Sequence, residues 1–101
     1  MDRQKKELSD LIGKLRQILP ELKEEYSIET IEVFGSYVRG EAHPSSDLDL
    51  LVTFSEVPGL FKFITLENHL SEMLGIKVYL VMKDALKPVI GENILKEALP
   101  V

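Results

Sequence analysis

Leucine and isoleucine recur at helical spacing near the start of the chain. Between Glu7 and Leu22 the apolar positions are three or four residues apart, which predicts an amphipathic helix with one face toward a core. The apolar residues of this helix are Leu8, Leu11, Ile12, Leu15, Ile18, Leu19 and Leu22. Pro20 falls inside the pattern, and a proline removes a backbone donor and crowds the preceding turn. The helix therefore either kinks at Pro20 or a second helical piece begins there.

Three later apolar segments are typical of strands. They are residues 28–35 (IETIEVFG), 47–54 (DLDLLVTF) and 76–82 (IKVYLVM). In the first segment Ile31 and Val33 share one face. The second segment is almost wholly apolar after its first residues, which is expected of a strand that is covered on both faces.

Helices are predicted between and after these strands. Residues 57–59 (VPG) form a loop, and Leu60–Leu74 gives a helix that ends at Gly75. The pattern predicts these core contacts for that helix: Leu60, Phe63, Ile64, Met73 and Leu74. Shorter helical segments follow at residues 83–86 and 92–99, separated by Pro88 and Gly91.

The lengths of the connections predict the topology of the sheet. A helix lies between the second and third strands, which allows a parallel crossover. The segment between the first two strands (GSYVRGEAHPSS) is too short for a crossover helix and suits an antiparallel return. We therefore expect a small α/β or α+β domain, residues 1–101, with helices packed on a mixed sheet of three or four strands. A length of 101 residues fits one such domain.

Composition and charge narrow the classes of function. The chain is 45% hydrophobic and 29% charged, has no cysteine, and has no apolar run near the roughly 20 residues that span a bilayer. Its charged start lacks the apolar core of a signal peptide, so a soluble cytoplasmic protein is expected. A net charge of −5 without a basic cluster argues against direct binding of nucleic acid.

Two aspartates begin the second strand segment. Residues two apart on a strand point to the same face, so Asp47 and Asp49 are expected side by side, with Leu48 and Leu50 pointing the other way. Adjacent carboxylates repel each other unless a cation neutralises both. Oxygen ligands of this kind favour Mg²⁺ or Mn²⁺, which bridge to substrate phosphates in nucleotidyl transfer. The pair therefore predicts a divalent-metal site.

A Gly-Ser pair precedes these acids. Gly35 lets the backbone approach a ligand closely, and a helical turn starting at Ser36 would offer N–H groups and a hydroxyl to an anion. Arg39, one turn later, is placed to bind a phosphate with its forked guanidinium. A Gly-Ser turn or a strand that begins with aspartate has ordinary structural explanations when it occurs alone. Together they favour a site with a phosphate-binding half and a metal-binding half.

The segment GSYVRGEAHPSSDLDLLV resembles the signature of the DNA polymerase beta-like nucleotidyltransferase superfamily, a Gly-Ser pair followed by Asp-x-Asp. Over nearly its full length the chain is similar to the minimal nucleotidyltransferases (MNT proteins) of that superfamily, which pair with HEPN-domain proteins in toxin–antitoxin modules. The resemblance implies the nucleotidyltransferase fold. It implies these site residues: Gly35, Ser36 and Arg39 for the triphosphate, Ser46 beside the phosphates, and Asp47 and Asp49 as the catalytic and metal-binding acids.

The same resemblance implies an activity and its partners. The protein would use Mg²⁺ or Mn²⁺ and a nucleoside triphosphate, ATP in the first place, to transfer a nucleoside monophosphate to a hydroxyl. The acceptor would be a tyrosine of a HEPN toxin. Because 101 residues leave little room for an acceptor-binding domain, a partner protein or a homo-oligomer is expected to supply that surface.

One position departs from the family. The family carries a third acid on the following strand, in a pattern like Val-Asp-Leu-Val, where this chain has Tyr79. A phenol, with a reference pKa of about 10, serves poorly as a metal ligand or as a base at neutral pH. Two alternatives follow from this departure. The chain is an active transferase, or it is a catalytically weak or inactive antitoxin that acts by binding its partner.

Overall fold

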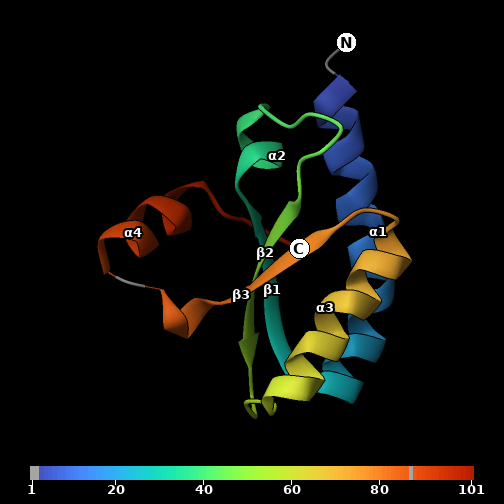
Figure 1. Cartoon of the computed structure of the whole chain (residues 1–101), viewed down its shortest axis with the longest axis vertical. Helices are drawn as coiled ribbons and strands as arrows, with labels where there is room; N and C mark the ends of the chain where they lie inside the picture. The colour runs from blue at the N-terminus through green and yellow to red at the C-terminus, as the bar shows by residue number, and fades with distance from the viewer. Residues whose placement is uncertain (1–2, 87) are drawn as a thin grey trace.

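Helices cover both faces of a four-stranded mixed sheet (Figure 1). The computed structural model describes the backbone of residues 3–86 and 88–101 and the side chains of residues 8–86 and 91–101. In chain order the elements are α1 (Arg3–Tyr26), β1 (Ile28–Phe34), α2 (Ser36–Arg39), β2 (Leu48–Phe54), α3 (Leu60–Leu74), β3 (Val78–Met82), the 3₁₀ turn η1 (Lys83–Ala85), α4 (Pro88–Glu97) and β4 (Leu99–Pro100).

The strand order β3-β2-β1-β4 confirms the predicted mixed sheet. The short segment after β1 returns antiparallel as β2, and α3 carries the chain to β3, which lies parallel to β2. The fourth strand corrects the prediction of a helix over residues 92–99. The helix α4 starts earlier, at Pro88, and ends at Glu97, so that Leu99 pairs with Val33 of β1. Proline is tolerated in the first turn of a helix because the N–H that it lacks would have no partner there.

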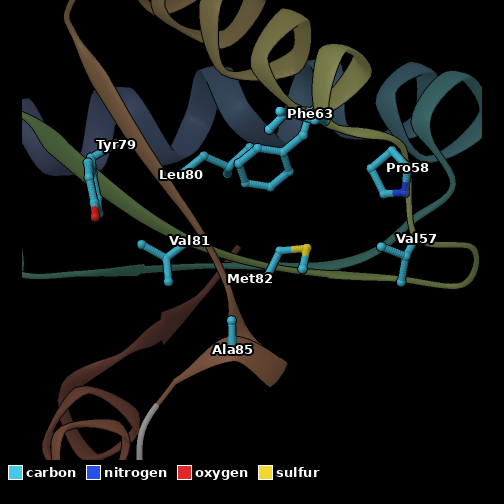
Figure 2. Close-up of a pocket in the computed structure, with 9 residues that line it drawn as sticks. Val57, Pro58, Phe63, Tyr79, Leu80, Val81, Met82 and Ala85 are labelled. Carbon is cyan, nitrogen blue, oxygen red and sulfur yellow. The ribbon is translucent and has the colours of Figure 1, made fainter.

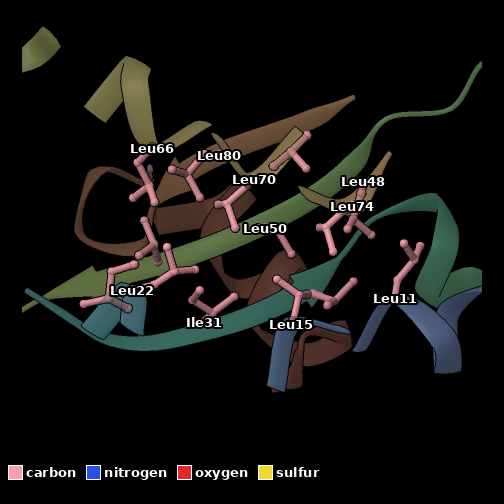
Figure 3. Packing of buried hydrophobic residues seen from close by; sticks show 14 of the residues in the cluster. Leu11, Leu15, Leu22, Ile31, Leu48, Leu50, Leu66, Leu70, Leu74 and Leu80 are labelled. Atoms are coloured by element: carbon pink, nitrogen blue, oxygen red, sulfur yellow. The ribbon is translucent and has the colours of Figure 1, made fainter. Parts of the chain in front are cut away.

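The main core lies between one face of the sheet and the helices α1 and α3 (Figure 3). Ile31 and Val33 of β1 point into it, as predicted. Leu48 and Leu50 of β2 are fully buried on the same face, and Leu51 is 1% exposed on the opposite face. The prediction that β2 is covered on both faces is therefore confirmed at its centre.

The helix α1 runs through Pro20 to Tyr26 without a break, so no second helix begins at the proline. Leu22 and Tyr26, both beyond the proline, are buried in the core cluster. Burial of large apolar side chains is worth about 1.5–3 kcal/mol each, which is comparable to the cost of a proline inside a helix. Tertiary packing thus holds the last turns of α1 in place.

The helix α3 buries a different stripe from the one that the sequence predicts. Leu74 is buried and Phe63 is partly buried, as expected. The three other predicted core contacts are 38% to 71% exposed: Leu60, Ile64 and Met73. Leu66 and Leu70 take their place and are fully buried. Both stripes have helical spacing, so only the packing of α3 on the sheet decides which of them faces inward.

The free edge of β3 is capped by side chains from α3. The N–H of Val78 donates to Ser71 Oγ at 2.9 Å, and the N–H of Leu80 donates to Glu67 Oε2 at 2.9 Å. Edge strands with free N–H groups tend to pair with other chains, and these two contacts satisfy the donors within the chain. None of the helices in the described part of the chain has the length and apolar character needed to cross a bilayer.

Candidate active site

The predicted site residues gather where β1 ends and β2 begins, because these two strands are antiparallel neighbours. Asp49 of β2 is paired with Phe34 of β1 on one side and with Tyr79 of β3 on the other. Asp47 directly precedes β2, and Gly35 and the helix α2 directly follow β1. The fold therefore brings the Gly-Ser turn and both acids to one end of the sheet.

Gly35 adopts a backbone conformation that glycine alone reaches without strain, with φ 84° and ψ −155°. Its carbonyl accepts hydrogen bonds from the N–H groups of Val38 and Arg39, at 3.1 and 3.2 Å, and so begins the single turn of α2. Ser36 is the first residue of that turn, as the sequence predicts. Gly40, at φ 72°, ends the turn in the left-handed conformation.

Gly35 is also packed against the carboxylate of Asp49. A Cβ atom at residue 35 would overlap Asp49 Oδ2 and lie 3.0 Å from Asp49 Cγ. The absence of a side chain at residue 35 thus lets the end of β1 come into direct contact with an acid of β2. The Gly-Ser turn and Asp49 therefore form one packed unit.

Gly35→Ala is expected to lower the free energy of unfolding by at least about 2 kcal/mol, because it combines a strained backbone with a steric overlap. Gly75→Ala is the matched control, since Gly75 also has a positive φ of 72° but has open space around its Cα. We expect it to cost only about 1 kcal/mol. Chemical denaturation of both variants measures the difference, and equal losses would contradict a contact between residue 35 and Asp49.

Burial and charge disfavour ionisation at Asp49. Burial, first, and the charge of Asp47, second, raise the pKa of the Asp49 carboxyl above its ordinary value. The positive charge of Arg39 acts in the opposite direction, and the charge of Glu97 adds to the rise. A cation bound between Asp47 and Asp49 would relieve both the burial cost and the repulsion.

The donor set fits a hard divalent cation that keeps some of its water. Within residues 8–86 and 91–101, no cluster of three or more His, Cys, Asp or Glu side chains could enclose a metal ion. Mg²⁺ is typically held by one or two carboxylates together with water and substrate phosphates. The Asp47–Asp49 pair matches that pattern, whereas a closed structural metal site does not.

Ser46 stabilises the turn that leads into the acid pair. Its N–H donates to the His43 carbonyl at 2.8 Å, and its hydroxyl oxygen accepts the His43 N–H at 2.9 Å. Ser45 Oγ lies 2.8 Å from His43 Nδ1. The Ser46 hydroxyl thus fixes the loop directly before Asp47, and its own proton is still able to donate to a further group.

Arg39 is engaged by two carboxylates. Its Nε donates to Glu41 Oε2 at 3.0 Å, and its Nη1 donates to both oxygens of Glu97, at 3.1 and 3.2 Å. The hydrogen bonds to Glu41 and then to Glu97 raise the pKa of the guanidinium. These contacts fix the direction in which the Arg39 side chain leaves the end of α2.

Glu97 contacts two of the predicted site residues, and the sequence does not reveal these contacts. It is the last residue of α4, and its Oε1 accepts the Gly35 N–H at 2.9 Å across 62 residues of sequence. Locally it belongs to an ordinary amphipathic helix. The pairing of β4 with β1 is what carries Glu97 to the Gly-Ser turn.

Tyr79 occupies the position predicted for it, on the strand beside Asp49. The two residues are register partners in the parallel pair β2–β3, so their side chains share a face of the sheet. The Tyr79 side chain is 54% exposed. The next acid along the chain, Asp84, lies beyond β3, in η1, and is exposed.

An open apolar groove of about 350 Å³ starts at Tyr79 and follows the free edge of β3. Figure 2 shows Tyr79 at one end of the groove and Val57 and Pro58 at the other, with Phe63 and Met82 between them. The neighbouring Phe61 is 85% exposed. An apolar groove with exposed aromatic and aliphatic neighbours is a common feature of protein–protein contact surfaces.

Comparison with known proteins agrees with this geometry. Residues 15–101 match the nucleotidyltransferase domain family. The protein adenylyltransferase MntA of Thermococcus cleftensis is 52% identical over 79 residues, which are 78% of this chain and 80% of that protein. A solved structure assigned provisionally as a minimal nucleotidyltransferase is 37% identical, with a TM-score of 0.78, over 100% of this chain and 97% of its own.

A more distant solved structure shares the fold. It contains a tri-AMPylated Shewanella oneidensis HEPN toxin in complex with an MNT antitoxin. The match has a TM-score of 0.60 and 21% identity, and it covers 96% of this chain and 70% of the other. Matches over most of the chain confirm the resemblance that the Gly-Ser and Asp-x-Asp segments indicated. This chain belongs to the nucleotidyltransferase domain family, in the minimal, MntA-related branch.

Proposed function

We propose that this protein binds ATP with Mg²⁺ and transfers the AMP group to a tyrosine hydroxyl of a HEPN-domain partner, releasing pyrophosphate. The observation that carries the proposal is the contact between Gly35 and Asp49, which joins the Gly-Ser turn to one acid of the pair. The protein adenylyltransferase relative supports the reaction class, and the MNT antitoxin complex supports the kind of partner. A reaction that uses ATP also fits the cytoplasmic location expected from the sequence.

In this proposal the phosphate chain lies on the β1 side of the acids. The Ser36 hydroxyl and the Arg39 guanidinium supply donors to the phosphates, and the glycine at residue 35 lets the nucleotide approach the backbone. The hydroxyl of Ser46 adds a donor at the entrance to β2. These groups hold the triphosphate in place while the bond from its α-phosphorus to pyrophosphate breaks and a bond to the acceptor oxygen forms.

Asp47 and Asp49 would hold the divalent cation, with Mn²⁺ as an alternative to Mg²⁺. When bound, such an ion neutralises phosphate charge and stabilises the charge that develops in the transition state. The raised pKa of Asp49 supports this assignment, because a partly buried carboxylate beside a second one is more stable when a cation is bound.

The acceptor would approach from the β3 side. The sheet order places β1 and β3 on opposite sides of β2, so α2 and Tyr79 flank Asp49. In phosphoryl transfer the attacking and leaving oxygens are roughly in line, so a triphosphate on the β1 side leaves the β3 side for the attacking hydroxyl. The apolar groove beside Tyr79 is therefore the surface that we assign to the acceptor-bearing segment of the HEPN partner.

A second candidate function is supported by Tyr79. No third acid completes the metal site within the described side chains, and the register partner of Asp49 is a tyrosine rather than a carboxylate. A chain of this kind with little or no transferase activity would act as an antitoxin by covering its partner. Both candidate functions require binding of the partner, so only the presence or absence of AMP transfer distinguishes them.

Incubation of the chain with Mg²⁺, the HEPN partner and ATP labelled in its α-phosphate tests the proposal. Transfer gives label on a tyrosine of the partner, located by mass spectrometry, and releases pyrophosphate. A control with ATP labelled in the γ-phosphate must give no labelled partner. Formation of a stable complex without any label would favour the binding-only antitoxin and refute the transferase.

Ser36→Ala is expected to weaken the binding of Mg-ATP by about 10- to 100-fold, because a hydrogen bond to a charged group is worth about 1.5–3 kcal/mol. Isothermal titration calorimetry measures the affinity. Ser9→Ala, an exposed serine on α1, is the matched control and should bind ATP as the wild type does. Equal affinities of the Ser36→Ala variant and the wild type would remove Ser36 from the phosphate-binding residues.

A further inference from the structure

We infer that Glu97 is a positioning residue of the nucleotide site: its carboxylate holds the Gly35 backbone and the Arg39 side chain in the arrangement that receives the triphosphate. Its Oε1 accepts the Gly35 N–H at 2.9 Å, and both of its oxygens accept from Arg39 Nη1 at 3.1 and 3.2 Å. The inference rests on the proposed function, since it concerns how that same site is kept in shape.

The sheet fixes Glu97 in place. Two residues after it, Leu99 pairs with Val33 of β1, and the N–H of Val101 donates to the Ile31 carbonyl at 3.0 Å. The side chain of Glu97 is 23% exposed. A carboxylate on a free arm would compete with phosphate for the same donors and leave when nucleotide arrives. The pairing of β4 with β1 keeps the backbone of Glu97 beside the Gly-Ser turn, so its carboxylate stays within reach of Gly35 and Arg39, and we assign it a lasting contact with the site.

The contact acts on both halves of the site. Gly35 lies between Glu97, which accepts its N–H, and Asp49, which packs against its Cα. A shift of the Gly35 backbone would therefore displace Ser36 and disturb the Asp49 carboxylate together. Glu41 accepts from Nε of Arg39 and Glu97 accepts from its Nη1, which sets the direction of the remaining N–H donors of the guanidinium.

Two substitutions separate the functions of the Glu97 carboxylate. Glu97→Gln keeps an oxygen that can accept the Gly35 N–H but removes the charge that pairs with Arg39. Glu97→Ala removes both contacts. Glu92→Ala is the matched control, because Glu92 is an exposed glutamate on the same helix. Each variant is compared with the wild type for the affinity of Mg-ATP by calorimetry, for KM and kcat of AMP transfer, and for hydrogen exchange at the Gly35 amide without nucleotide.

We expect Glu97→Ala to weaken Mg-ATP binding by about 10- to 100-fold, the usual effect of removing an outer partner that orients a binding site. KM for ATP should rise more than kcat falls, the Gly35 amide should exchange faster, and Glu97→Gln should recover part of both effects. Glu92→Ala should match the wild type in every measurement.

Other outcomes would overturn the inference. Tighter ATP binding by either Glu97 variant would show that the carboxylate competes with phosphate. A lower melting temperature with unchanged ATP affinity would show a role in stability alone. If Glu97→Ala does not fold, Glu97→Gln decides the matter, and an unchanged ATP affinity together with an unchanged KM in that variant refutes the inference. A wild-type chain that binds no nucleotide would refute the proposed function itself, and is recognised before any variant is compared.

Discussion

Tyr79→Asp is expected to raise the rate of labelled-AMP transfer to the partner by about 10²- to 10⁴-fold, the usual worth of a general base. The register of β2 and β3 places residue 79 beside Asp49 on the same face of the sheet. An aspartate there would complete a three-carboxylate site and offer a base to the acceptor hydroxyl. Initial rates at saturating ATP measure the effect.

Tyr79→Asn is the matched control, because asparagine has the size of aspartate but cannot act as a base. It should leave the rate near that of the wild type. Tyr79→Asp should also be modestly less stable without Mg²⁺, since a third carboxylate would be repelled by the other two. If the wild type already transfers AMP rapidly and Tyr79→Asp changes nothing, the role assigned to residue 79 is wrong. Inactivity of both forms would favour the binding-only antitoxin.

Asp49→Asn is expected to reduce AMP transfer by at least about 10²- to 10³-fold, because loss of a metal ligand removes several kcal/mol of transition-state stabilisation and each 1.4 kcal/mol is about tenfold. The same substitution should not destabilise the protein without metal. The pKa of Asp49 is raised in the folded state, so at neutral pH its charge opposes folding, and this cost disappears when the group is protonated or replaced by a neutral amide.

Thermal unfolding and the transfer assay together test this pair of effects. If Asp49 serves function, the Asp49→Asn variant loses transfer activity while the metal-free protein keeps equal or higher stability, as is common for residues kept for function. Asp84→Asn, on the exposed turn η1, is the control and should change neither property. A large loss of stability in Asp49→Asn would instead assign Asp49 a structural role in holding the Gly35 turn.

Local chemistry allowed much of this protein to be predicted from its sequence. The Gly35–Ser36 pair, the spacing of Asp47 and Asp49 and the apolar run of β2 each depend on residues that are close in the chain. The length of the connections was enough to predict an antiparallel return and a parallel crossover, because a short segment cannot carry a crossover helix. Membership of the nucleotidyltransferase family followed from the same local pattern.

Contacts between distant parts of the chain were decided by the tertiary structure alone. Both apolar stripes of α3 fit a helix, and packing on the sheet buried the one that contains Leu66 and Leu70. The two-residue strand β4 is too short to give a pattern, yet its pairing with β1 brings Glu97 to Gly35 across 62 residues. Sequence periodicity records which faces of an element are apolar, whereas the partner of a polar side chain depends on how the elements pack. For this reason the sequence was enough to propose Asp47 and Asp49 as site residues, whereas only the fold shows the contact between Glu97 and Gly35.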